Sequence, residues 1–238
     1  MADYDNQALR GRGVTADQAI DQGLRSYMIS VYNYMMIGLG VTGLVAYFTS
    51  ATPALFAAIY GTPLVWVVMF SPLIFVMIFA TSINRISAGT AQALFWAFSA
   101  LMGLSLAYIF RVYVAVDIMK VFFITAASFG ALSLYGYTTK TNLSAFGSFL
   151  FIGLVGVFLA MVVNIFLQSS AMDFAISVIG VLVFAGLTAY DTQKIKDSYY
   201  SGDDASTTGK KAIMGALTLY LDFVNMFLFL LRLLGNRN

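Results

Sequence analysis

Cysteine, histidine and glutamate are all absent from this chain of 238 residues. Without cysteine the protein can form no disulfide, and it has no thiol nucleophile or thiolate ligand for a metal. Without histidine it has no imidazole for a Ser-His or Cys-His dyad, and no side chain that ordinarily titrates near neutral pH. Rhomboid-type serine proteases and histidine-dependent metalloproteases are therefore excluded.

Charged residues are also scarce, at 10% of the chain, whereas a soluble domain contains about 25%. Hydrophobic residues make up 60%. The net charge of +2, with no basic stripe, does not indicate a nucleic-acid partner. The composition predicts a membrane protein with the lipid bilayer as its environment. Its chemistry must be built from aspartate, lysine, arginine, hydroxyls, amides and the backbone.

Seven hydrophobic segments are long enough to cross a bilayer, which requires about 20 mostly apolar residues. These segments lack the period-two alternation of a transmembrane β-barrel. The sequence therefore predicts an all-α integral membrane protein with seven transmembrane helices. The expected spans are residues 27–48, 63–83 (with Pro72 near its middle), 90–110, 117–137, 144–167, 174–190 and 212–234.

The first 25 residues are polar and do not have the pattern of a cleaved signal peptide. The predicted organisation is a polar N-terminal tail, residues 1–25, followed by a transmembrane domain, residues 26–238. Alternating crossings place 9 Lys and Arg residues on the N-terminal side and 4 on the other, which predicts a cytoplasmic N-terminus. If the last segment were re-entrant, 11 Lys and Arg residues would lie on the N-terminal side and 2 on the other. Charge alone therefore leaves both arrangements open.

Nine of the 11 aspartates lie in tails, loops or span edges, which leaves Asp191 and Asp222 as candidates. Asp222 lies roughly 15 Å into the last span, and Asp191 closes the sixth. An ionised aspartate at a helix centre costs about 2.5–3.5 kcal/mol to insert, so such a residue favours a functional role. A structural hydrogen bond or a solvated helix cap is the alternative for each.

The last two spans are joined by one loop, so we expect them to be antiparallel neighbours whose aspartates can meet. Two carboxylates in a low-dielectric site cannot both ionise cheaply, and such a pair can share a proton and respond to pH without histidine. Arg85, at the end of the second span, is a candidate partner for an ionised aspartate. Protonation would release that ion pair. The alternative for Arg85 is simple anchoring at the membrane interface.

Each aspartate lies in a recognisable segment: residues 186–193 read GLTAYDTQ, and residues 217–227 read LTLYLDFVNMF. With these two segments the sequence resembles the Bax inhibitor-1 family, also called the transmembrane Bax inhibitor motif family, in its bacterial YccA/YetJ-like branch. The resemblance covers nearly the whole chain after the polar tail. It implies a central last helix surrounded by the other six. It also implies a pH-sensitive calcium leak of the bacterial inner membrane, with Asp191 and Asp222 as sensor and gate. In that family an arginine on the second helix holds the first of the two aspartates in the closed state, and this latch role maps onto Arg85.

The candidate site also includes Asn225, Tyr190 and Thr192 as supporting residues beside the two aspartates. Calcium prefers six to eight oxygen ligands, so Asp191 and Asp222 would form only a weak and transient Ca²⁺ site. A permeation path requires weak binding, because the ion must leave again. We expect Ca²⁺ and protons as permeating or titrating ions, and no resident cofactor.

Other functions compete with this interpretation. An intramembrane aspartyl protease also needs two membrane aspartates, but its Gly-x-Gly-Asp motif is replaced here by Tyr220-Leu221-Asp222, so we expect no enzyme. A retinal protein needs a lysine in the last span, and residues 212–234 contain none. The stronger alternative is a non-transporting stress protein that modulates the membrane protease FtsH, a partner that the resemblance to bacterial relatives implies.

Overall fold

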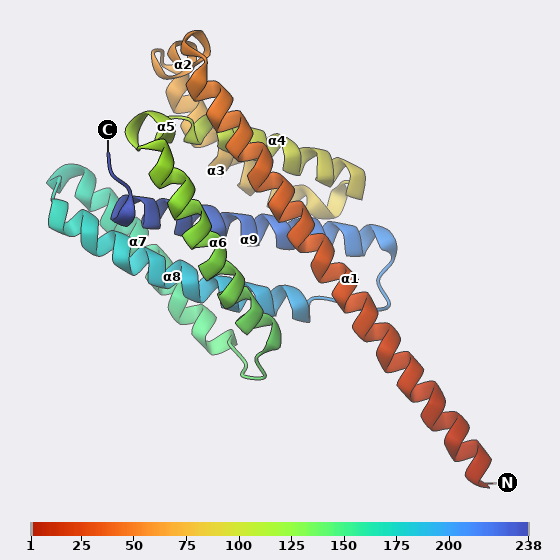
Figure 1. Cartoon of the computed structure of the whole chain (residues 1–238). Coiled ribbons are helices and arrows are strands. Elements are labelled where there is room, and N and C mark those ends of the chain that lie inside the picture. Colours follow the sequence, from red (N-terminus) through yellow and green to blue (C-terminus); the bar gives the residue numbers. More distant parts are fainter. Residues whose placement is uncertain (1, 238) are drawn as a thin grey trace.

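The computed structural model describes the backbone of residues 2–237 and the side chains of residues 20–237. Within that part of the chain, nine α-helices and one 3-10 helix form a bundle without strands (Figure 1), which confirms the all-α prediction. The helices are α1 (Ala2–Ala51), α2 (Pro53–Tyr60), α3 (Leu64–Ser82), η1 (Ile83–Arg85), α4 (Ala88–Leu106), α5 (Ile109–Val112), α6 (Ala115–Thr138), α7 (Ser144–Leu167), α8 (Ser170–Asp197) and α9 (Ala205–Leu234).

Seven helical segments are long and apolar enough to cross a membrane, in agreement with the seven predicted spans. The last two are longer than predicted: α8 continues to Asp197 and α9 begins at Ala205. The start of α9 is fixed by a cap, in which Asp204 Oδ1 accepts a hydrogen bond of 2.9 Å from the Thr207 backbone N–H. Hydrogen bonds from the Thr207 side chain and backbone hold the pKa of Asp204 below its usual value. A hydropathy criterion misses this polar first turn.

The third predicted span, residues 90–110, is divided between α4 and α5. Helix α4 ends at Leu106, and the Tyr60 hydroxyl donates a hydrogen bond of 2.6 Å to the Leu104 carbonyl oxygen. A side chain from α2 thus satisfies a carbonyl group where the intrahelical ladder stops.

The predicted tail, residues 1–25, and the first span belong to the same helix, since α1 runs from Ala2 to Ala51. The predicted boundary after residue 25 therefore falls inside a continuous helix. The side chains of residues 1–19 lie outside the described part of the chain, so the cytoplasmic placement of the tail stays a prediction.

The connections between the spans gather at two opposite ends of the bundle. At one end, Gln193 Oε1 accepts a hydrogen bond of 2.8 Å from the Leu143 N–H. At the other end, the Asn236 N–H donates to Asp117 Oδ2 at 2.9 Å. Helix α9 is one unbroken helix of 30 residues that reaches from one end to the other, which favours a full crossing over the re-entrant alternative. We call the first end the basic end, because its loops and helix ends carry Arg85, Lys140, Lys194, Lys196, Lys210 and Lys211.

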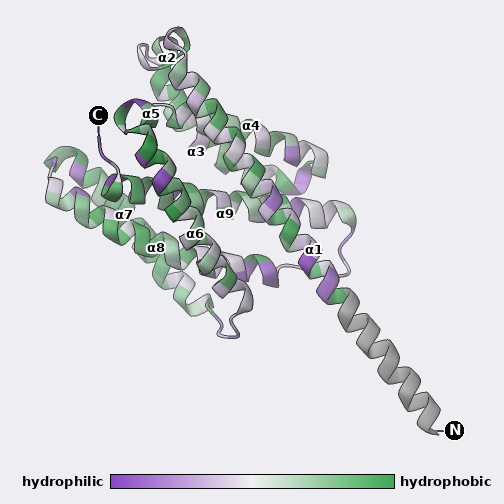
Figure 2. Ribbon diagram, viewed as in Figure 1, coloured by the Kyte–Doolittle hydropathy of each residue, from purple (hydrophilic) through white to green (hydrophobic). Residues whose placement is uncertain are grey.

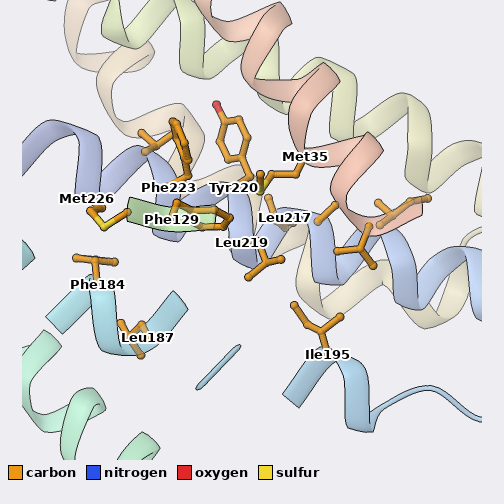
Figure 3. Packing of buried hydrophobic residues seen from close by; sticks show 14 of the residues in the cluster. Met35, Phe129, Phe184, Leu187, Ile195, Leu217, Leu219, Tyr220, Phe223 and Met226 are labelled. Atoms are coloured by element: carbon orange, nitrogen blue, oxygen red, sulfur yellow. The ribbon is translucent and has the colours of Figure 1, made fainter. Parts of the chain in front are cut away.

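Helix α9 occupies the centre of the bundle, as the family resemblance implies. In its apolar window 61% of the residues are buried, against 11–33% in the other spans. It packs against α1, α4, α6 and α8 (Figure 1), and its buried residues form the middle of the core with Phe129 and Phe184 (Figure 3). Lipid is as apolar as leucine, so apolar surface alone does not drive a helix inward. The polar groups of α9, Asp222 among them, give the physical reason, because they are costly to expose to hydrocarbon.

The outward faces of the helices are strongly apolar (Figure 2). Phe166, Val116 and Ile152 have 83%, 72% and 71% of their surface exposed. A soluble protein would not present so many large apolar side chains to water. The protein is therefore a multi-pass membrane protein whose outer surface contacts lipid.

Pro72 lies inside α3, where it can donate no backbone hydrogen bond to the Val68 carbonyl oxygen. The Ser71 hydroxyl donates to that oxygen instead, at 3.1 Å. This substitution of a side-chain donor for a backbone donor lets α3 continue through a proline in a medium without water.

A buried hydroxyl pair joins α9 to α1 and gives a first test of the packing. The Tyr220 hydroxyl lies 2.6 Å from Thr42 Oγ1, which is also 2.8 Å from the Ser99 carbonyl oxygen. We expect Thr42→Val to lower the free energy of unfolding by about 1–3 kcal/mol, because the Tyr220 hydroxyl would be left buried without its partner. Tyr220→Phe should cost only about 1 kcal/mol, because Thr42 keeps the Ser99 carbonyl.

Unfolding of the detergent-solubilised protein, followed by circular dichroism, measures both effects. Tyr34→Phe is the matched control, since the Tyr34 hydroxyl makes an exposed bond of 3.3 Å to Gln92 and its loss should change little. Equal stability of the Thr42→Val and Tyr34→Phe variants would contradict the assigned role of the pair.

Candidate functional site

The structure brings the two predicted aspartates together between α8 and α9. The side chains of Asp191 and Asp222 lie within hydrogen-bonding reach of each other. The helices can approach closely because Gly215 of α9 faces Ile195 of α8, where an added Cβ atom would lie 2.9 Å from the Ile195 side chain. The antiparallel pairing of the two helices thus sets the register that opposes the two carboxyl groups.

The two carboxyl groups have different surroundings. Asp222 has 5% of its surface exposed, and its Oδ2 atom is buried without a hydrogen-bond partner among the described residues. Asp191 is half-buried. Among residues 20–237, no group of three or more acidic, histidine or cysteine side chains could hold a metal ion. Any cation at this site would therefore have only these two carboxylates as charged ligands.

A cavity of about 1030 Å³ between α7, α8 and α9 contains both aspartates. The predicted supporting residues Tyr190 and Asn225 also line it. The Asn225 side-chain nitrogen donates to the Leu221 carbonyl oxygen at 2.8 Å, so Asn225 can offer its own Oδ1 to a cation. The cavity therefore combines two carboxyl groups with a neutral amide oxygen.

A smaller cavity, of about 250 Å³, lies between Asp191 and the basic end. It shares Asp191, Lys194 and Thr218 with the larger cavity. Asp191 therefore lies where the larger cavity, which is open along α7 beside the exposed Ile152, meets the smaller one near the basic end. Lys194, three residues later on the same helix, places a positive charge beside Asp191 and lines both cavities.

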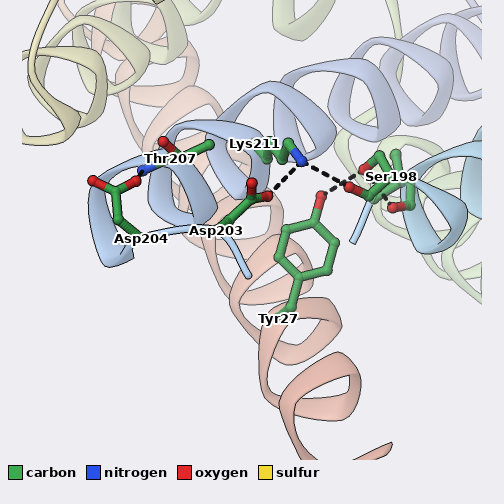
Figure 4. A network of polar contacts seen from close by, with 7 residues as sticks. Tyr27, Ser198, Asp203, Asp204, Thr207 and Lys211 are labelled. Atoms are coloured by element: carbon green, nitrogen blue, oxygen red, sulfur yellow. Dashed lines mark hydrogen bonds and ion pairs between the residues drawn. The ribbon is translucent and has the colours of Figure 1, made fainter. Parts of the chain in front are cut away.

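A network of polar contacts lines the small cavity at the basic end (Figure 4). Lys211 forms an ion pair with Asp203 and donates a hydrogen bond of 3.0 Å to the Ser198 carbonyl oxygen. The Ser198 hydroxyl lies 3.1 Å from the Tyr27 hydroxyl of α1. The network thus ties α1, the loop between α8 and α9, and the first turns of α9 together beside the small cavity.

Lys194, Lys211 and Tyr27 also lie beside the candidate site, a placement that the sequence did not predict. Lys194 could have been identified from its spacing, because a residue three positions after Asp191 lies on the same face of a helix. Nothing in the sequence places Tyr27 beside the α8–α9 loop, because that contact depends on how α1 crosses the bundle.

Thr192 faces away from the cavity, toward α6. Its hydroxyl lies 2.9 Å from Ser133 Oγ, which in turn lies 2.6 Å from the Tyr32 hydroxyl. The structure therefore does not bring Thr192 together with the aspartates, although Thr192 follows Asp191 in the sequence. Its observed contacts instead connect α8 to α6 and α1.

Arg85 is exposed at the end of η1. Among residues 20–237, the structure does not join Arg85 to Asp191 or Asp222. The latch assigned to Arg85 stays a prediction, and it would require a different arrangement of the bundle. The ion pairs seen in this part of the chain are Lys211–Asp203, Arg232–Asp173 and Arg237–Asp173.

Comparison with known proteins identifies the class of molecule in which this site occurs. A family model described as inhibitor of apoptosis-promoting Bax1 matches residues 24–238. The chain therefore belongs to the Bax inhibitor-1 family. The match includes all seven spans and both aspartate segments.

Bacterial relatives are similar over nearly their full length. The inner membrane protein YbhL of Escherichia coli is 46% identical over 218 residues, which cover 90% of this chain and 93% of that protein. An uncharacterized protein of Rickettsia prowazekii is 45% identical over 221 residues, covering 93% and 94% of the two chains. An uncharacterized protein of Caulobacter vibrioides is 45% identical over 230 residues, covering 92% of each.

Proposed function

We propose that this protein is a pH-sensitive calcium leak channel of the bacterial inner membrane, with Asp191 and Asp222 as its sensor and gate. The observation that supports this function most directly is the contact between two carboxyl groups inside a transmembrane bundle. The basic end would face the cytoplasm, in accordance with the positive-inside rule. The proposal includes no resident cofactor and no enzymatic reaction.

Electrostatics explains why such a contact can respond to pH. Two unit charges 4 Å apart repel each other by about 4 kcal/mol at an effective dielectric constant near 20. The carboxyl contact is therefore compatible with a proton shared by the pair, and loss of that proton would drive the two groups apart. An ionised Asp191 would then need a cation, for which Arg85 and Ca²⁺ are the proposed partners.

This scheme assigns the observed arrangement to the protonated pair, in which Arg85 is not bound to either aspartate. At higher pH, the Arg85–Asp191 ion pair would hold the calcium path closed. Acidification would release Arg85 and allow Ca²⁺ to pass through the two connected cavities. Weak coordination by two carboxylates and Asn225 suits an ion that must also leave.

Calcium flux into proteoliposomes tests the proposed function. The purified protein is reconstituted around a calcium-sensitive dye, and dye fluorescence is followed in buffers from mildly alkaline to mildly acidic pH. We expect flux above that of protein-free vesicles, increasing as the pH falls. Flux equal to that of empty vesicles at every pH would reject the channel and leave the non-transporting partner of an FtsH-type protease as the alternative.

Arg85→Gln tests the latch. We expect this variant to carry calcium at alkaline pH about as fast as the original protein does in acid, because an ionised Asp191 would lose its cationic partner. Lys140→Gln is the matched control, since Lys140 is another exposed cation at the basic end. Retention of the original pH response in Arg85→Gln would remove Arg85 from the mechanism without affecting the roles of the two aspartates.

A further inference from the structure

An apolar groove runs along the outside of the bundle between α1 and α6, with Phe223 of α9 among its lining residues. It has a volume of about 880 Å³, within the usual range for sites that bind small organic ligands. A second apolar cavity, of about 360 Å³, continues it and shares Leu39, Gly43, Phe122 and Phe223. This groove is separate from the cavity that contains the aspartates.

Three glycines leave the groove open. Gly40 and Gly43 on α1 and Gly130 on α6 would each accept a Cβ atom with nothing within 4 Å. In contrast, a Cβ atom at Gly103 would lie 2.7 Å from the Thr42 carbonyl oxygen, so that glycine serves close helix packing. The three groove glycines therefore maintain an unfilled space. Unfilled space forfeits dispersion contacts, and hydrocarbon is the natural filling for an apolar groove that faces the bilayer.

A cation lies beside one end of the groove. Tyr137, which lines the groove at the basic end, accepts a hydrogen bond of 3.0 Å from Lys196 Nζ through its carbonyl oxygen. The same ammonium group lies 5.9 Å from the centre of the Tyr137 ring. Lys140 is exposed at this end as well, with Asp197 as an exposed acid. The apolar groove thus has an ammonium group at its end near the membrane interface.

The length of the groove matches one leaflet of a bilayer. On α1 the lining extends from Tyr32 to Leu44, which corresponds to about 18 Å of helix. Half of the hydrocarbon core of a bilayer measures about 15 Å. A lipid chain that enters at the basic end would therefore extend along the groove to the middle of the membrane.

We propose that this groove binds one phospholipid, with an acyl chain between α1 and α6 and its phosphate group at Lys196. The polar end and the apolar length of the site correspond to the two parts of such a molecule. A second copy of the chain would also cover apolar surface, but a phospholipid supplies both an apolar chain for the groove and a phosphate for the ammonium of Lys196 beside Tyr137. This site is independent of the proposed channel function.

Native mass spectrometry of the protein purified in mild detergent tests the site. We expect the original protein to retain one phospholipid, and Gly130→Leu or Gly43→Leu to reduce its affinity roughly tenfold or more, equivalent to about 1.4 kcal/mol. Gly156→Leu on α7 is the matched control, because Gly156 is also exposed and open to a Cβ atom but lies outside the groove. Circular dichroism verifies that each variant is folded.

A second pair of variants tests the headgroup contact. Lys196→Gln should weaken retention of phosphatidylglycerol added to the delipidated protein, whereas Lys140→Gln should retain it like the original protein. Equal lipid binding by the folded Gly130→Leu, Gly43→Leu and Gly156→Leu variants would overturn the proposal. It would also be overturned if filling the groove dissociated a dimer that carried no lipid.

Discussion

Asp191→Asn is expected to abolish the pH dependence of calcium flux and to fix it at the acid level of the original protein. Asparagine at this position cannot ionise, so it can neither repel Asp222 by charge nor form an ion pair with Arg85. The proteoliposome assay at mildly alkaline pH measures the effect directly. At that pH we expect roughly a tenfold higher flux than in the original protein, equivalent to about 1.4 kcal/mol in the closing equilibrium.

Asp222→Asn should have a different effect. Asp191 would remain ionisable but would lose the carboxyl group that shares its proton, so stronger acid would be needed to release Arg85. The midpoint of the flux curve is therefore expected to move to lower pH, by about one unit for each 1.4 kcal/mol of lost interaction.

Asp173→Asn is the control for both substitutions. Asp173 is also on α8 but lies at the end opposite the basic end, where it pairs with Arg232 and Arg237 at 4.0 and 3.9 Å. The control should leave the flux curve unchanged. If both aspartate variants also matched the original protein in flux and pH response, the assignment of the sensor would be wrong.

Gly136→Ala is expected to destabilise the bundle by about 3 kcal/mol, at the upper end of the usual cost of overpacking. A Cβ atom at Gly136 on α6 would overlap the Ala189 carbonyl oxygen on α8 and would lie 2.9 Å from the Ala189 carbonyl carbon. Backbone atoms of a packed helix cannot move aside separately. The methyl group would therefore push α6 away from α8 and lengthen the bond between Ser133 and Thr192.

Unfolding in detergent measures this loss, with Gly130→Ala as the matched control on the same helix. A Cβ atom at Gly130 would meet nothing within 4 Å, so this second substitution should be neutral or slightly stabilising. Similar stabilities for the two alanine variants would show that α6 and α8 can separate at little cost.

Much of the fold could be predicted from the sequence. The spans follow from the length of the apolar segments, because each crossing must satisfy its own backbone hydrogen bonds. The ends of the helices were less predictable. Helix α9 begins seven residues before the predicted span, at Ala205, because Asp204 caps a polar first turn. Helix α4 ends where Tyr60 from a separate helix supplies a hydrogen bond, and hydropathy contains no trace of that contact.

The candidate site was predictable in part for the same reason. A charged residue inside an apolar segment is visible in the sequence, and so both aspartates could be identified. Their partners were less visible. Thr192 follows Asp191 but faces α6, whereas Lys194 and Tyr27 line the small cavity beside it. Which neighbour matters depends on the rotation of each helix about its axis, which the sequence does not state.

The amino-acid sequence is enough to identify a seven-span membrane protein with two embedded aspartates and no histidine. These properties follow from composition and segment length alone. The three-dimensional packing was needed to show that the two carboxyl groups meet, that Arg85 is paired with neither of them, and that three glycines leave a groove open between α1 and α6. Each of these depends on the register and rotation of packed helices. In a bilayer, van der Waals fit and polar contacts determine that packing, because an apolar surface is as stable against lipid as against another helix.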